Sequence, residues 1–197
     1  MFHPFASSVA VYGGGLPEVV HDDTALEPKS SYGIQKLIGE LLLNDFTRKG
    51  FIDGRGVRLP TISVRPGKPN KAASSFASSI IREPLNSEAA VCPVTPDTRL
   101  WLLSPRQAIE CLVWAHNLDS NAYPPSRILN LPGVSVTVAE MIEALGKIAG
   151  EDAVARIRMK SDPVVQRIVG SWPGRWDMTR AHELGFKGDS DFESIVR

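Results

Sequence analysis

Tyr32 and Lys36 lie four residues apart and could together carry out proton-transfer chemistry. A phenol with an ordinary pKa of about 10 is a poor base at neutral pH, but an ammonium group held beside a phenol favours the phenolate. A hydroxyl from another element would complete the site by binding the reacting alcohol or carbonyl, and Ser8 is the candidate. The three residues predict a proton relay for hydride chemistry, although a Tyr-Lys pair alone also occurs on ordinary solvated helix faces.

The pair lies at the start of a predicted amphipathic helix. Ser30 or Ser31 is expected as its N-cap and Gly50 just beyond its end, and residues four apart share one helix face. Apolar residues recur along the helix at three- and four-residue intervals, which predicts one buried stripe. This stripe consists of Ile34, Leu37, Ile38, Leu41, Leu42 and Phe46.

Short apolar runs at residues 8–13 and 57–64 flank this helix and predict two parallel strands with the helix as their crossover. Ser8 is expected where open α/β sheets present their ligands, at the C-terminal end of the first strand. Further along, "RLWLLSPRQAIECLVWAHNL" predicts a strand and a helix, and "RILNLPG" predicts another strand. A capping box from Thr137 to Glu140 opens a later helix.

Composition narrows the class of partner. The chain has 197 residues, of which 43% are hydrophobic, enough for one domain or for one domain and a small second one. Its 22 basic and 22 acidic residues balance without long runs of one sign, which indicates no nucleic-acid or membrane partner. Without a secretory signal or an apolar segment of about 18 residues, a cytoplasmic location is expected. Cys92 and Cys111 have no metal-site spacing, so we expect buried thiols and no metal.

The sequence resembles the extended branch of the short-chain dehydrogenase/reductase superfamily, the NAD-dependent epimerase/dehydratase family. The family pattern "SSxxVYG", about two dozen residues before "YxxxK", appears here as "SSVAVYG" at 7–13 and "YGIQK" at 32–36. The resemblance continues through "VRLPTISVRPG", "LWLLSPRQAIECLVWA", "ILNLPGVSVTVAEMIEAL" and "RAHELGF". It therefore covers nearly the whole chain.

The resemblance implies an α/β fold, an incomplete Rossmann-like, doubly wound parallel sheet with a smaller α/β substrate-binding part. Residues 1–67 would form the C-terminal half of the NAD-binding domain with its catalytic helix. Residues 68–197 would be mainly substrate-binding, with 99–131 returning to the main sheet. The implied activity is NAD-dependent oxidation of a small, four-carbon sugar acid. The alternatives are a nucleotide-sugar epimerase or dehydratase, and a non-catalytic truncated homologue with a binding or regulatory role.

The resemblance also assigns roles to residues. Tyr32 would take the alcohol proton, Lys36 would hold the nicotinamide ribose, and Ser8 would orient the substrate hydroxyl. Residues expected near the cofactor are, besides Tyr32 and Lys36, Ser7, Leu59 and Pro60. Residues expected near the substrate are, besides Ser8, Thr61, Arg65, Asn70, Ser75 and Arg106.

A site for a sugar acid must also bind the carboxylate of that acid, which requires a guanidinium group or several hydrogen-bond donors. Arg65 and Arg106 are the candidate arginines, and both could equally be ordinary surface or helix-start charges. A small-molecule partner is expected, and a homodimer is one option for assembly.

Members of this family begin with a glycine-rich dinucleotide fingerprint and an acidic residue about 20 positions further on. Here only "MFHPFA" precedes the serine-bearing strand. We therefore expect weak NAD binding by the chain alone. Three explanations are open: a fragment of a longer product, a naturally shortened copy, or a chain that a partner completes.

Overall fold

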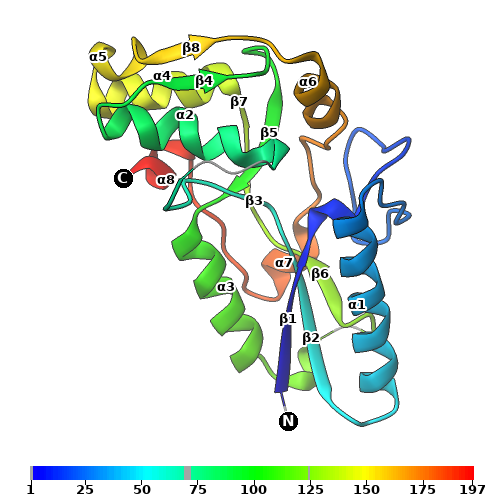
Figure 1. Cartoon of the computed structure of the whole chain (residues 1–197). Coiled ribbons are helices and arrows are strands. Elements are labelled where there is room, and N and C mark those ends of the chain that lie inside the picture. Colours follow the sequence, from blue (N-terminus) through cyan, green and yellow to red (C-terminus); the bar gives the residue numbers. More distant parts are fainter. Residues whose placement is uncertain (1, 69–71, 124) are drawn as a thin grey trace. The chain divides into compact units, whose positions relative to one another are not determined.

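Strands and helices alternate along the chain, and the fold is α/β with mostly parallel strand pairing, as predicted. The structure is a computed structural model that describes residues 2–68, 72–123 and 125–197 (Figure 1). The chain divides into two compact units, which are described separately. The first unit comprises Met1–Pro60, Arg106–Gly133 and Arg175–Gly188. The second unit comprises Thr61–Pro105, Val134–Gly174 and Asp189–Arg197.

The first unit is built on a parallel sheet flanked by helices. Its elements are, in chain order, β1 (Phe2–Ser8), the 3₁₀ turn η1 (Val9–Val11), α1 (Ser31–Arg48), β2 (Asp53–Leu59), nearly all of α3 (Pro105–Asn117), the 3₁₀ turn η3 (Ser120–Ala122), β6 (Ile128–Asn130) and α7 (Thr179–Glu183).

The sheet of the first unit has the strand order β1-β2-β6 and is parallel throughout. The predicted order of strand, crossover helix and parallel strand is confirmed, since α1 connects β1 to β2. The second strand was predicted at 57–64, but β2 ends at Leu59, and residues 61–62 form β3 in another sheet. Pro60 directly follows the last pair of that ladder, Ser8 with Leu59, and proline has no N–H to extend it.

Alternate residues of β2 face two different helices. A side chain on Gly54 would come within 2.7 Å of Leu43 in α1. The intervening Arg55 instead donates hydrogen bonds to the carbonyl oxygens of Ala115 and His116 at the end of α3, at 2.9 and 2.7 Å. Because successive strand residues point to opposite faces, α1 and α3 cover opposite faces of the sheet (Figure 1).

The first strand differs from its prediction over residues 8–13. β1 ends at Ser8, and η1 follows where a strand was expected. The Ser8 Oγ accepts a hydrogen bond from the backbone N–H of Ala10 at 3.2 Å and so caps η1. Such local side-chain bonds offer the backbone an alternative to the strand ladder. Ser8 nevertheless occupies the C-terminal end of the strand, where it was expected.

The N-cap of α1 is Ser30, within the prediction, but the predicted buried stripe is wrong. The face of α1 that packs on the sheet carries the glycines Gly33 and Gly39 with Glu40 and Leu43. A Cβ atom on Gly39 would lie 2.5 Å from the Phe5 ring, so the small residues allow a close approach. Most residues of the predicted stripe are instead exposed, by 43 to 61%. These residues are Ile34, Ile38, Leu41, Leu42 and Phe46.

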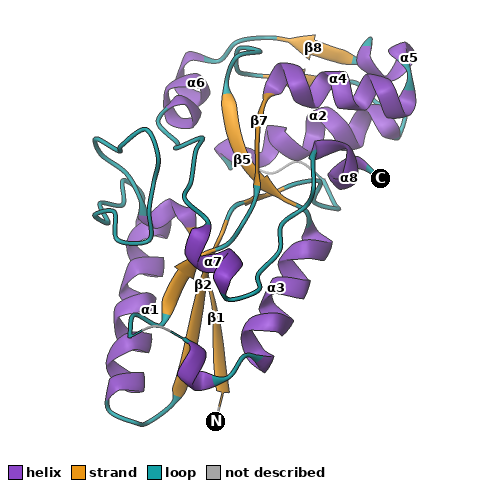
Figure 2. Cartoon of the chain, turned by 180° about the vertical axis from the view of Figure 1, so that it is seen from behind, coloured by secondary structure: helices purple, strands orange, loops and turns teal. Residues whose placement is uncertain are grey.

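The second unit combines two small sheets with several helices (Figure 2). Its elements are, in chain order, β3 (Thr61–Ile62), the 3₁₀ turn η2 (Ala73–Ser75), α2 (Phe76–Leu85), β4 (Ala90–Cys92), β5 (Arg99–Leu103), β7 (Val134–Thr137), α4 (Val138–Ala149), α5 (Glu151–Val154), β8 (Ile157–Met159), α6 (Pro163–Gly170) and α8 (Phe192–Val196).

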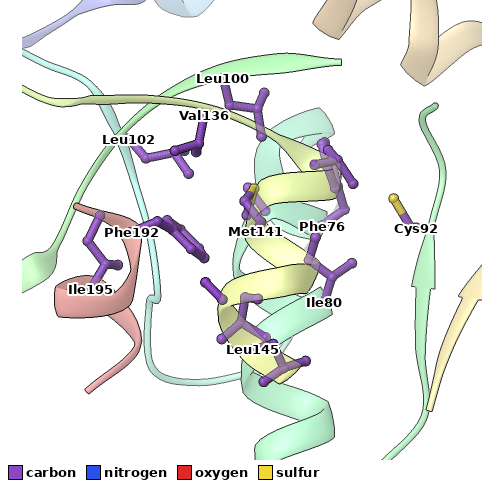
Figure 3. Packing of buried hydrophobic residues seen from close by; sticks show 14 of the residues in the cluster. Phe76, Ile80, Cys92, Leu100, Leu102, Val136, Met141, Leu145, Phe192 and Ile195 are labelled. Carbon is purple, nitrogen blue, oxygen red and sulfur yellow. The ribbon is translucent and has the colours of Figure 1, made fainter. Parts of the chain in front are cut away.

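The core of the second unit lies where α2, α4 and α8 meet the strands β5 and β7 (Figure 3). One sheet has the order β3-β5-β7, and the other pairs β4 with β8. Phe76 of α2 and Met141 of α4 are buried in the same cluster as Phe192 of α8. The capping box predicted from Thr137 to Glu140 is confirmed, with both reciprocal hydrogen bonds present.

The two cysteines are free and buried, as predicted. Burial raises the pKa of the Cys92 thiol, which also donates a hydrogen bond to the carbonyl oxygen of Val94. A thiol of this kind is unreactive compared with a thiolate.

Candidate active site

Tyr32 is held in the first turn of α1 by two local features. The Ser30 side chain caps the helix by accepting a hydrogen bond from the N–H of Gly33 at 3.1 Å. Any side chain on Gly33 would overlap the carbonyl oxygen of Ala10, so a glycine lets the helix start pack directly against η1. The Tyr32 side chain remains 54% exposed beside this contact.

Lys36 brings a positive charge between Tyr32 and the end of β1. Its Nζ donates a hydrogen bond to the carbonyl oxygen of Ala6 at 2.8 Å. The same Nζ lies 5.5 Å from the centre of the Tyr32 ring and 5.3 Å from that of Phe5. Cation–π contacts of this length are attractive. The structure therefore brings the predicted Tyr-Lys pair together at an accessible surface of the first unit.

Ser8 and Leu59 form the last paired position of β1 and β2, at the C-terminal edge of these strands. Ser8 lies two residues after Ala6, the residue that binds Lys36. Its Oγ accepts the Ala10 N–H and keeps its own hydrogen for donation. Pro60 follows Leu59 and is buried. Three of the predicted positions thus share the strand ends at which open α/β sheets bind ligands.

A buried charged cluster behind the Tyr-Lys pair is the main feature that sequence reasoning missed. Glu40 lies one turn beyond Lys36 and is 2% exposed, and Arg58 of β2 is 4% exposed. The Arg58 guanidinium donates to both oxygens of the Glu40 carboxylate, from Nε at 2.9 Å and from Nη2 at 2.8 Å. Ser7 donates its hydroxyl to the same carboxylate. This cluster clamps α1 to both β1 and β2.

Ser7 was expected near the cofactor, and the structure places it in this clamp. The residue is 3% exposed, and its hydroxyl is bonded to Glu40. Ser7 therefore supports α1 from beneath. Any direct contact with a cofactor stays a prediction.

The cluster continues through Arg58 to a buried phenol. Arg58 Nη1 donates to the Tyr12 hydroxyl at 2.5 Å, and that hydroxyl donates to Asn130 Oδ1 at 3.0 Å. Burial by itself would lower the pKa of Arg58, but the hydrogen bonds and charge of Glu40 outweigh it, and the pKa is raised. Burial raises the pKa of Tyr12, against the opposing effect of Arg58. Both effects favour a neutral phenol beside a permanent Arg58-Glu40 ion pair.

The sequence held one signal for this clamp. Glu40 is a charged residue on the same helix face as two glycines, Gly33 and Gly39, and that face is the one small enough to pack closely. Its partners Ser7 and Arg58 lie 33 and 18 positions away in the chain. No local pattern links residues at such separations.

The predicted substrate residues fall into both units. Arg65 and Ser75 line one small cavity in the second unit, together with residues of α2. Thr61 begins β3 and pairs with Leu102. Arg106 is exposed in the first turn of α3 in the first unit, and Asn70 lies outside the described residues. Of the predicted substrate residues, Arg65 and Ser75 therefore line the same cavity.

Among the described residues, no group of three or more histidine, cysteine or acidic side chains could hold a metal ion. Over the same residues, none of the helices combines the length and apolarity needed to cross a membrane.

Two curated relatives match almost the whole chain. D-erythronate dehydrogenase from Cupriavidus necator is 59% identical over 193 residues, which are 98% of this chain and 60% of the relative. D-erythronate dehydrogenase from Haemophilus influenzae is 51% identical over 98% of this chain and 61% of its own length. The chain therefore spans about three fifths of the length of these relatives.

Solved structures agree with the fold. The crystal structure of the nucleoside-diphosphate-sugar epimerase from Agrobacterium tumefaciens has a TM-score of 0.95 and 48% identity, over 99% of this chain and 57% of that structure. L-threonine 3-dehydrogenase from Trypanosoma brucei has a TM-score of 0.85 and 25% identity, over 99% of this chain and 60% of that structure. A family model also matches residues 4–117, more than half of the chain. The chain belongs to the NAD dependent epimerase/dehydratase family.

Proposed function

We propose that the chain carries the proton-transfer residues of an NAD-dependent dehydrogenase that oxidises a small sugar acid of the D-erythronate type. The observation that carries this proposal is the position of the Lys36 ammonium, bound to the Ala6 carbonyl oxygen and facing the Tyr32 ring. The identity to two D-erythronate dehydrogenases supports the choice of substrate.

The residues present fit the nicotinamide ribose end of NAD. An ammonium group has three N–H donors, and with one of them bound to Ala6 the others remain for ribose hydroxyls. Leu59 and Pro60, at the same strand ends as Ser8, would form an apolar wall beside the nicotinamide ring. When bound, NAD supplies the acceptor for the hydride that leaves the alcohol carbon.

Residues of this chain accept the proton that leaves the substrate hydroxyl. Tyr32 Oη, as the phenolate that the Lys36 ammonium stabilises by its charge, takes the proton of the alcohol as the carbon–oxygen bond becomes a carbonyl, and Tyr32 is left as the neutral phenol. Ser8 Oγ donates a hydrogen bond to the reacting oxygen and fixes its orientation. The Glu40-Arg58 clamp keeps α1, and with it both reacting side chains, at a fixed height above the sheet.

The proposal is tested in a chimera in which this chain replaces the matching segment of the Cupriavidus necator relative. D-erythronate should then reduce NAD, as measured by NADH absorbance. A chimera that folds and binds NAD but does not oxidise D-erythronate would contradict the proposal.

A second candidate is a reaction on a nucleotide sugar, favoured by the likeness to the Agrobacterium tumefaciens epimerase. The same chimera separates the two candidates. Conversion of a nucleoside diphosphate sugar, followed by chromatography and without D-erythronate turnover, would favour the second.

A further inference from the structure

A small cavity in the second unit has the composition of an anion-binding site. It measures about 80 Å³ and is lined by the loop that follows β3 and by one side of η2 and α2. The lining residues are Arg65, Pro66, Lys68, Ser75, Ser78 and Arg82. Three of them are cationic and two carry hydroxyl groups.

The backbone N–H and carbonyl groups of Arg65 both form hydrogen bonds to α2, and these bonds hold the loop against the helix. The N–H of Arg65 donates to Ser78 Oγ at 3.0 Å. The carbonyl oxygen of Arg65 accepts a hydrogen bond from Arg82 Nη1 at 2.6 Å. The wall formed by these residues is therefore held in place before any ligand arrives, which lowers the ordering cost of binding.

The cavity has an excess of positive charge. Arg82 pairs with the neighbouring Glu83 at 2.5 Å, so this arginine is largely neutralised. Among the residues that the structure describes, no carboxylate forms an ion pair with Arg65 or Lys68. Two cations that share one cavity without a local counter-ion repel each other, and a bound anion would relieve that repulsion.

We propose that this cavity binds the anionic group of the substrate, the carboxylate of a small sugar acid. The identity of the acid rests on the proposed function, whereas the preference for an anion rests on the cavity alone. About 10–15 Å³ of cavity volume holds one water molecule, so about 80 Å³ has room for a carboxylate or one inorganic phosphate. Arg65 supplies the planar fork that matches a carboxylate, and Lys68 adds a second charge.

Binding to the chain itself tests the proposal without any need for turnover. Isotope-labelled chain is titrated with D-erythronate, with erythritol, which has the same carbon chain but no charge, and with inorganic phosphate. NMR shifts at residues 65–68 report occupancy of the cavity. D-erythronate should shift these signals and erythritol should not. Phosphate binding with no response to D-erythronate would overturn the assignment to a sugar acid.

Variants locate the site. Arg65→Gln and Lys68→Gln should each weaken D-erythronate binding by about tenfold or more, since each removes a hydrogen bond between charged groups. Arg167→Gln, at an exposed arginine of α6 in the same unit, should leave binding unchanged. Unchanged affinity in both cavity variants would overturn the proposal.

Binding to the chain and turnover in the chimera separate this proposal from the proposed function. If the cavity binds the acid but the chimera does not oxidise it, the anion site stands and the dehydrogenase proposal fails. If oxidation occurs with an unchanged KM in Arg65→Gln, the dehydrogenase stands and the anion site fails.

Discussion

At the residue scale, the arrangement that matters is a single ammonium group shared by a strand end and a phenol. Lys36 binds the Ala6 carbonyl oxygen and faces the Tyr32 ring. The hydrogen bond fixes the charge at the strand ends, while the exposed ring leaves the phenol accessible to a ligand.

Lys36→Met in the chimera should lower kcat by about 100-fold or more, the usual contribution of a positioned acid-base group. The methionine keeps an unbranched apolar side chain but removes the charge that stabilises the phenolate, together with the hydrogen bond to Ala6. Steady-state kinetics with D-erythronate measures the effect. Lys49→Met, at the exposed C-cap of the same helix, should retain parental kcat. Equal rates in both variants would show that the ammonium has no role in proton transfer.

Asp177 should make the stability of the chain depend on acidic pH. Hydrogen bonds from the Thr179 hydroxyl, the Thr179 N–H and His21 hold the pKa of Asp177 at about 2, against 3.8 ordinarily. A lowered folded-state pKa stabilises the fold above the unfolded value, and this stability is lost as pH falls from about 4 towards 2. Urea unfolding at several pH values should therefore show a smaller loss over this range for Asp177→Asn than for the parent. Parallel curves would contradict the assignment.

At the element scale, α1 is held to the sheet by an ion pair and by close packing of glycines instead of an apolar stripe. Glu40, Arg58 and Ser7 form the polar part of this contact. Gly39 lets the helix approach the Phe5 ring. The helix that carries Tyr32 and Lys36 is thus positioned by directional hydrogen bonds as well as by close packing.

Glu40→Gln should destabilise the first unit by roughly 3–5 kcal/mol, because it leaves the buried Arg58 charge unpaired. Glu27→Gln is the matched control, since the Glu27-Lys29 pair is exposed and such pairs contribute about 0–1 kcal/mol. Urea denaturation followed by circular dichroism measures both variants. A loss below about 1 kcal/mol in Glu40→Gln would show that the clamp does not hold α1.

Two leucines of α1 test which face is buried. Leu43 is 8% exposed and contacts the sheet, whereas Leu41 is 61% exposed. Leu43→Ala should cost about 2–5 kcal/mol of unfolding free energy, and Leu41→Ala about 0.5 kcal/mol or less. Denaturant unfolding compares them directly. The reverse order would restore the apolar stripe that periodicity predicts.

At the scale of the whole molecule, local signals predicted the elements better than they predicted what the elements bury. Ser30, Gly50 and the Thr137-Glu140 capping box mark helix ends that the structure contains, because caps depend on residues close in sequence. The buried face of α1 could not be predicted in this way. Its partners come from β1 and β2, and the periodicity of α1 by itself favours the opposite face.

The charged residues also differ in whether the sequence reveals their contacts. The Tyr32-Lys36 pair is visible in sequence because both residues lie on one helix. Arg58 and Glu40, or Arg65 and Arg82, meet only through tertiary contacts between separate elements. Residue spacing therefore predicted that Tyr32 and Lys36 lie together, and the structure was needed to find the clamp and the cationic cavity.

The most direct test of the proton relay is the turnover rate of Tyr32→Phe in the chimera, with D-erythronate and NAD, beside Tyr123→Phe. The control removes a buried phenol hydroxyl of the same unit that has no hydrogen-bond partner among the described residues. Proton transfer through Tyr32 predicts that kcat falls by about 100-fold or more in Tyr32→Phe, with an unchanged circular dichroism spectrum, and stays near parental in Tyr123→Phe. A Tyr32→Phe protein that turns over as fast as the control would contradict it.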